Sequence, residues 1–177
     1  MASPALSEQL AAAIRDVPDF PKPGIVFKDI TPLLADAELL RRAVVGMAEP
    51  FAHERVAYVV GVESRGFILG APVALELGAG FIPVRKPGKL PYRTSAAEYA
   101  LEYGTDRLEI HADAHGPEAR VLVVDDVLAT GGTAAATCRL VEGLGGVVVG
   151  CSFLIALSFL PGRAALAGRR VKALVTF

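Results

Sequence analysis

The clearest structural pattern in the chain is RVLVVDDVLATGGT, residues 120–133. It begins with β-branched residues and leucines, a run typical of a strand buried on both faces of a parallel sheet. The run ends in Asp125 and Asp126, and Gly131 and Gly132 follow shortly after. Apolar residues then recur at the spacing of an amphipathic helix. The segment therefore predicts a buried strand, a glycine turn and the start of a helix.

The glycine turn is suited to binding a phosphate group. Gly131 and Gly132 let the backbone turn sharply and approach a ligand closely. The N–H groups around Thr133 would be unpaired at the helix N-terminus, where the helix dipole also favours an anion. The hydroxyl groups of Thr130 and Thr133 can add hydrogen bonds. The alternative is a plain strand–turn–helix connection, because glycine turns are common.

The loop lacks the two common nucleotide-binding patterns. It has no lysine for G-x-x-x-x-G-K-[ST], and it does not read G-x-G-x-x-G. Instead, Asp125 and Asp126 directly precede the turn. Neighbouring strand residues point to opposite sides, so these carboxylates are poorly placed to share a proton and better suited to accept hydrogen bonds from sugar hydroxyls. A ribose 5-phosphate group would use both the acids and the turn.

Two other expected strands are followed by cationic residues. Residues 56–62 predict a buried strand, and Arg65 comes just after it, beside a glycine, where it can reach a pyrophosphate. Residues 80–84 predict a second strand, which is followed by the cations Arg85, Lys86 and Lys89. In a parallel sheet these groups would share one edge and favour a polyanion. The alternatives are a surface salt bridge for Arg65 and a solvated loop for the others.

Strands alternate with helices along the chain, which predicts an α/β fold with a mainly parallel central sheet flanked by helices. The 177 residues suggest one domain, residues 1–177, with a small N-terminal cap at about 1–35 and a flexible lid loop at about 85–111. The first helix is expected to run from Pro4 to Val17.

Composition excludes several classes of protein. Hydrophobic residues make up 53% and the net charge is -1, which excludes a disordered chain and a strongly basic nucleic-acid-binding protein. No secretory signal or apolar run of membrane-spanning length is visible. The cysteines and histidines lack zinc-site spacing. A soluble cytoplasmic protein is expected, without nucleic-acid or membrane partners.

Residues 123–133 resemble the phosphoribosyl diphosphate (PRPP) signature of type I phosphoribosyltransferases. A wider resemblance, to the adenine phosphoribosyltransferase family, rests on segments in that family's order: residues 18–32, 63–67, 85–91 and 101–104. The signature alone indicates the superfamily, and the other segments indicate the adenine enzyme. The resemblance implies the type I phosphoribosyltransferase fold and a glycosyltransferase (a pentosyltransferase) of purine salvage that converts adenine and PRPP to AMP and pyrophosphate.

The resemblance also implies which residues hold PRPP. The 5′-phosphate is expected on Ala129, Thr130, Gly131, Gly132 and Thr133. The ribose hydroxyls are expected on Asp125 and Asp126. The leaving pyrophosphate is expected on Arg65, Arg85, Lys86 and Lys89. Mg²⁺ is implied as part of the Mg–PRPP complex, with no direct protein ligand assigned.

For adenine, the resemblance implies stacking on Phe27 and hydrogen bonds from backbone groups around Val26 and Lys28. By composition alone Phe27 could equally be a core aromatic. Lys28 departs from the family, where arginine is frequent, and a backbone contact would survive that change. Glu102 takes the catalytic position and Tyr103 closes over the site by resemblance. Taken alone, these two residues read as an exposed acid and a half-buried aromatic on a hairpin.

The resemblance implies a homodimer, and two alternative functions remain. One is a phosphoribosyltransferase for another base, such as hypoxanthine, guanine or xanthine, because selection between a 6-amino and a 6-oxo purine is hard to establish from sequence. The other is a non-catalytic regulator that senses PRPP. Such a regulator should carry an added helix-turn-helix or a basic face, and the 177 residues leave little room for one.

Overall fold

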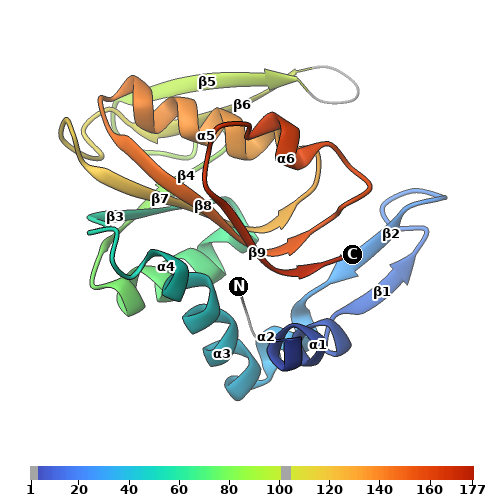
Figure 1. Ribbon diagram of the computed structural model, residues 1–177. Coiled ribbons are helices and arrows are strands. Elements are labelled where there is room, and N and C mark those ends of the chain that lie inside the picture. The colour runs from blue at the N-terminus through green and yellow to red at the C-terminus, as the bar shows by residue number, and fades with distance from the viewer. Residues whose placement is uncertain (1–3, 101–104) are drawn as a thin grey trace.

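The computed structural model describes residues 4–100 and 105–177. Its centre is a five-stranded sheet in the order β4-β3-β7-β8-β9, and every pair of neighbouring strands is parallel (Figure 1). The strands are β3 Tyr58–Val62, β4 Gly80–Val84, β7 Arg120–Leu128, β8 Val147–Ala156 and β9 Val171–Thr176. The α/β fold with a parallel sheet, predicted from the alternation of strands and helices, is confirmed.

Helices cover both faces of the sheet (Figure 1). One apolar cluster joins the sheet to α1 Pro4–Ala12, α2 Thr31–Ala35, α3 Ala37–Ala48 and α4 Arg65–Leu77. The opposite face packs against α5 Gly132–Gly143 and the region of α6 Gly162–Ala165. A short 3-10 helix, η1 Glu49–Phe51, follows α3. No helix among the described residues is long and apolar enough to cross a membrane.

Strand β7 lies at the middle of the sheet and is buried on both faces. Leu122 and Val124 join the cluster under α3 and α4, whereas Val121 and Val123 pack on the side of α5. Burial on both faces explains why residues 121–124 of this strand are all apolar. The strand does not end at the two aspartates, as the sequence suggested. It continues to Leu128 because the long strand β8 supplies pairing partners along its whole length.

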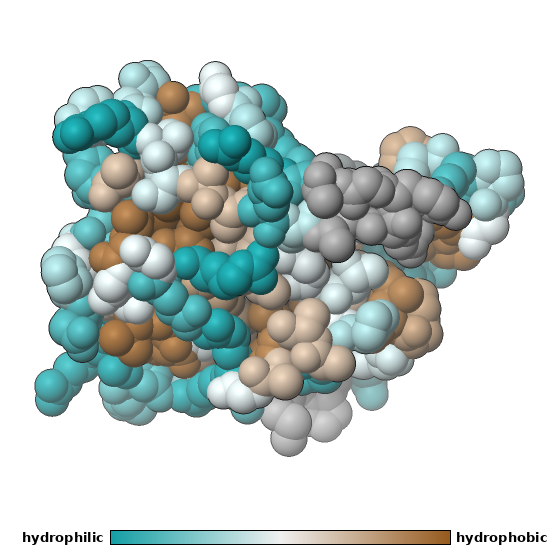
Figure 2. Space-filling model, turned by 90° about the horizontal axis from the view of Figure 1, so that it is seen from above, coloured by the Kyte–Doolittle hydropathy of each residue, from teal (hydrophilic) through white to brown (hydrophobic). Residues whose placement is uncertain are grey.

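Two antiparallel hairpins flank this core. The hairpin of β1 Arg15–Pro18 and β2 Val26–Asp29 projects from the body (Figure 1) and forms the right-hand end of the surface seen from above (Figure 2). The hairpin of β5 Thr94–Ala100 and β6 Thr105–His111 packs against α5. The expectation of a first helix reaching Val17 is wrong. Residues 15–18 instead pair with β2, and this pairing removes them from the helix.

Candidate active site

A cavity of about 420 Å³ opens at the carboxyl ends of β3 and β7, beside β2. It brings together members of every predicted group that the structure describes: Val26, Phe27, Lys28, Arg65, Lys86, Asp125, Asp126, Ala129 and Thr133. Five other predicted residues are not among those that line it: Arg85, Lys89, Thr130, Gly131 and Gly132. Glu102 and Tyr103 lie outside the residues that the structure describes.

The turn between β7 and α5 is the glycine turn that the sequence predicted, at the start of a helix. Gly131 is the residue before the first turn of α5 and has a φ of 83°. A Cβ atom at this position would lie 2.7 Å from the Cβ of Ala165 and 2.7 Å from the carbonyl oxygen of Gly162. Only glycine fits both the backbone angle and this space. Ala129, just before the turn, and Thr133, in the first turn of α5, both line the cavity. The N–H groups at the start of α5, which have no partner within the helix, therefore lie near the cavity wall.

The two aspartates of β7 differ in their electrostatic environment. Asp126 is buried and accepts a hydrogen bond from Nε of Arg65. Asp125 Oδ1 accepts the N–H of Asp126 at 2.9 Å, and a Cβ on Gly66 would come within 2.8 Å of that oxygen. Burial raises the pKa of Asp125 well above its ordinary value, and the charge of Asp126 raises it further. The two carboxylates predicted to accept hydrogen bonds from the ribose are therefore not equivalent in their electrostatic environment.

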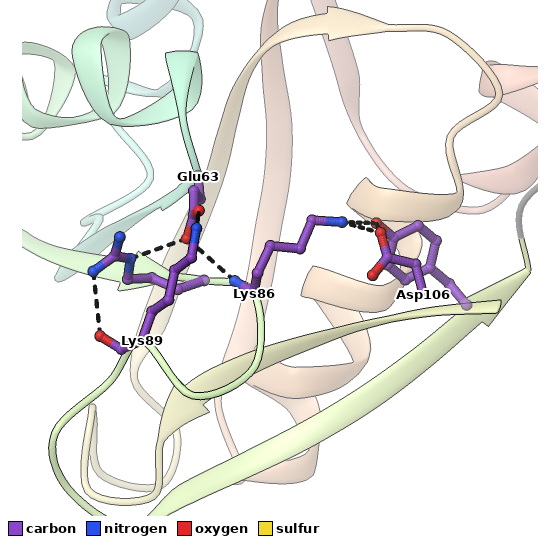
Figure 3. Close-up of polar contacts among 6 residues, drawn as sticks. Glu63, Lys86, Lys89 and Asp106 are labelled. Carbon is purple, nitrogen blue, oxygen red and sulfur yellow. Dashed lines mark hydrogen bonds and ion pairs between the residues drawn. The ribbon is translucent and has the colours of Figure 1, made fainter.

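Glu63 forms hydrogen bonds and ion pairs with the cationic residues of the loop after β4. Its carboxylate accepts hydrogen bonds from Nε of Arg85 at 3.0 Å, from the N–H of Lys86 at 3.2 Å and from Nζ of Lys89 (Figure 3). Burial alone would raise the pKa of Glu63, but these hydrogen bonds outweigh it and hold that pKa below its usual range. The Glu63–Ser64 peptide is cis.

Sequence reasoning gave no role to Glu63, although a signal for its pairing was present. Val62 and Val84 are partners in the parallel register of β3 and β4, so Glu63 and Arg85 are the next residues along each strand. An acid and a base in this position at two neighbouring strand ends are expected to pair.

Lys86 turns away from Glu63 toward the β5–β6 hairpin (Figure 3). Its Nζ contacts the carboxylate of Asp106 and lies 3.3 Å from the hydroxyl of Tyr99. That hydroxyl donates a hydrogen bond to Asp106 Oδ2 at 2.9 Å. Tyr99 and Asp106 are a cross-strand pair, and Tyr99 lines the cavity. Sequence reasoning missed both residues, because only the register of the hairpin places them opposite each other.

On the β2 side of the cavity, Phe27 is half-buried rather than part of the core. Its ring meets that of Phe20 edge-on at 5.1 Å, and the guanidinium carbon of Arg65 lies 5.1 Å from its centroid. Nζ of Lys28 pairs with Asp16 at 2.6 Å and lies 4.0 Å from the centroid of Phe177. Phe27 and its β2 neighbours Val26 and Lys28 therefore border the same cavity as Ala129 and Thr133 of the glycine turn.

A central parallel sheet with a glycine turn after β7, two aspartates before that turn and cations after β3 and β4 agree with the fold of the type I phosphoribosyltransferases. In agreement, the phosphoribosyl transferase domain family matches residues 42–158. Among the described parts of the chain, no group of three or more His, Cys, Asp or Glu residues is placed to hold a metal ion.

Comparison with individual relatives shows which family of phosphoribosyltransferases the chain belongs to. The adenine phosphoribosyltransferase of Myxococcus xanthus is 60% identical over 97% of this chain and 94% of its own length. The crystal structure of the Rhodothermus marinus enzyme of the same name superimposes with a TM-score of 0.95 at 57% identity, covering 99% of this chain and all of its own. The crystal structure of the Saccharomyces cerevisiae adenine phosphoribosyltransferase, which contains adenine, superimposes with a TM-score of 0.90 at 39% identity. The match covers 96% of this chain and 98% of the yeast chain. The chain belongs to the adenine phosphoribosyltransferase family.

Proposed function

We propose that the cavity at the ends of β3 and β7 is where this enzyme joins adenine to PRPP, giving AMP and pyrophosphate. The observation that carries the proposal is the convergence of three kinds of group on one cavity. Ala129 and Thr133 come from the phosphate turn, Asp125 and Asp126 from β7, and Phe27 from β2. These groups match the phosphate, the sugar and the base of a purine nucleotide.

In the proposed reaction, N9 of adenine forms a bond to C1′ of the ribose as the bond from C1′ to the pyrophosphate oxygen breaks. The transition state has oxocarbenium character, as in other glycosyl transfers. Asp125 and Asp126 hold the ribose hydroxyls, and residues 129–133 hold the 5′-phosphate. Because little covalent chemistry falls to the protein, these residues act by positioning the two substrates. Glu102 is assigned to proton transfer at the purine, and Tyr103 to closing over it.

The departing pyrophosphate carries several negative charges, and four cations are proposed to neutralise them: Arg65, Arg85, Lys86 and Lys89. Arg65 and Lys86 line the cavity, whereas Arg85 and Lys89 do not line it but pair with Glu63, which does. Charge stabilisation of the leaving group is a large source of rate enhancement in such reactions.

Adenine is proposed to lie against Phe27, with backbone groups of Val26 and Lys28 at its edge. The side chain of Lys28 is held by Asp16, which leaves its backbone to make the base contact. Mg²⁺ is proposed to enter as part of the Mg–PRPP substrate, because phosphate and hydroxyl oxygens are its preferred ligands. A cytoplasmic homodimer is proposed for the working enzyme.

The experiment that tests this proposal is nucleotide formation from PRPP and equal concentrations of adenine and hypoxanthine, with and without Mg²⁺. We expect Mg²⁺-dependent AMP and little IMP. Phe27→Ala should raise the KM for adenine about tenfold, because stacking of one base on an aromatic ring is worth roughly 1–3 kcal/mol, while the KM for PRPP stays within about twofold. Predominant IMP would overturn the assignment of the base. Saturable PRPP binding without turnover would favour the regulator.

A further inference from the structure

We propose that Asp106 competes with the pyrophosphate group of PRPP for the ammonium group of Lys86, and so sets how tightly PRPP binds. Asp106 is then a positioning residue, which acts through Lys86 and does not touch the substrate. The inference rests on the proposed role of Lys86 in binding pyrophosphate. It concerns a carboxylate that lies beside the cavity, on β6, and is not among the described residues that line it.

The two ends of Lys86 are held in different ways. Its backbone N–H donates to Glu63 at 3.2 Å, while its Nζ contacts Asp106 and the hydroxyl of Tyr99 (Figure 3). Lys86 itself lines the cavity. The backbone is therefore anchored on one side of the cavity, and rotation of the side chain alone can carry the ammonium group from Asp106 to an anion inside it.

The backbone of the loop has further attachments to β6, so it need not move for this exchange. Arg85 and Glu109 exchange two backbone hydrogen bonds, of 2.9 and 2.8 Å. The N–H of Gly88 also donates to the carboxylate of Glu109 at 3.1 Å. Since these contacts do not involve the side chain of Lys86, loss of the Asp106 carboxylate should change the affinity for the substrate and leave the loop in place.

The Asp106–Lys86 pair is suited to exchange. The Lys86 and Asp106 side chains are 40% and 24% exposed, so the pair is partly hydrated, and such pairs are weak. Asp106 also keeps a hydrogen bond from Tyr99 at 2.9 Å when the ammonium group leaves. A pyrophosphate offers more negative charge and more acceptor oxygens than one carboxylate, which favours transfer of Lys86 to the substrate.

Asp106→Asn removes the competing charge and keeps an oxygen that can accept from Tyr99. We expect the KM for PRPP and the Kd of Mg–pyrophosphate, measured by calorimetry, to fall roughly two- to fivefold, the range of a partly exposed ion pair. The KM for adenine and kcat should not change. Asp106→Ala should give the same gain. A matched control is Asp113→Asn, which removes one charge from an exposed acid in the turn after β6. An equal gain in this control, or no gain in either Asp106 variant, would overturn the proposal.

A double-mutant cycle separates competition for Lys86 from simple repulsion between Asp106 and pyrophosphate. Lys86→Gln should raise the KM for PRPP, and adding Asp106→Asn to it should cause no further change. A persisting gain in the double variant would mean that Asp106 repels the substrate directly, and the competition would be refuted. If Lys86→Gln leaves PRPP binding unchanged, the proposed role of Lys86 fails. Absence of AMP formation by the wild type would instead refute the proposed function.

Discussion

The turn after β7 and the loop after β4 offer two kinds of group for binding phosphates. The turn offers backbone N–H groups at the start of α5, and close packing of Gly131 against Ala165 sets its shape. The loop, residues 85–89, offers side-chain cations, and these are already paired with the protein's own carboxylates, Glu63 and Asp106. Backbone dipoles fixed by packing need no counter-ion, whereas clustered cations do. We infer that the first site is preformed and that the second binds by exchanging partners.

The largest expected effect comes from changing the shape of the preformed turn. Gly131→Ala combines a positive φ with a Cβ placed 2.7 Å from two neighbouring atoms. We expect kcat/KM for PRPP to fall at least about 100-fold and the free energy of unfolding to fall by roughly 2–4 kcal/mol. Steady-state kinetics and urea unfolding measure the two quantities.

The control for Gly131 is Gly78→Ala at the end of α4. Gly78 also has a positive φ, 64°, but no atom lies within 4 Å of an added Cβ. It should lose only about 1 kcal/mol of stability and keep its KM for PRPP. If Gly131→Ala behaves like this control, the turn is adaptable, and the contrast between a preformed and an exchanging site is wrong.

Asp125, at the foot of the preformed turn, should show opposing effects on binding and stability. Its pKa in the folded protein lies above the ordinary value of 3.8, so the folded state penalises its charge. Wild-type stability should therefore fall as pH rises from that value through the folded pKa. Asp125→Asn should raise the KM for PRPP about tenfold through loss of a charged hydrogen bond. At neutral pH it should also unfold with a free energy about 1 kcal/mol higher.

Unfolding across a pH series checks the sign of this effect. The stability difference between Asp125→Asn and wild type should grow as pH rises. A difference that shrinks with rising pH would show that Asp125 is stabilised as a carboxylate, contrary to its surroundings.

Glu63, at the foot of the cation loop, should depend on pH in the opposite direction. Its pKa is held below the ordinary value of 4.5, so it contributes stability above that pH and loses it as pH falls through the folded pKa. Glu63→Gln should lower the free energy of unfolding by about 1 kcal/mol at pH 7, and the loss should vanish in acid. Glu76→Gln, at an exposed position of α4, is the control and should change little. A loss that is independent of pH would assign Glu63 a role in packing instead of charge pairing.

Local pattern was enough to predict the sheet and the turn. Two-sided burial requires the apolar run of β7, and Gly131 is needed at the start of α5, so both are visible in the sequence. The contacts that make the loop after β4 different from the turn after β7 could not be predicted from local sequence pattern. The pairing of Lys86 with Asp106 depends on the register of the β5–β6 hairpin, and residues 15–18 form a strand only by pairing with β2. Tertiary pairing also moved the end of the first helix and the end of β7 away from the expected residues.

A crystal structure of the protein with bound Mg–PRPP would test the contrast between the two sites most directly. We predict that residues 129–133 keep the present backbone, with a positive φ at Gly131 and the 5′-phosphate on the N–H groups of α5. We also predict that Nζ of Lys86 leaves Asp106 for a pyrophosphate oxygen, while Tyr99 stays bonded to Asp106. A rearranged turn, or a Lys86 that remains on Asp106 beside bound pyrophosphate, would contradict this picture.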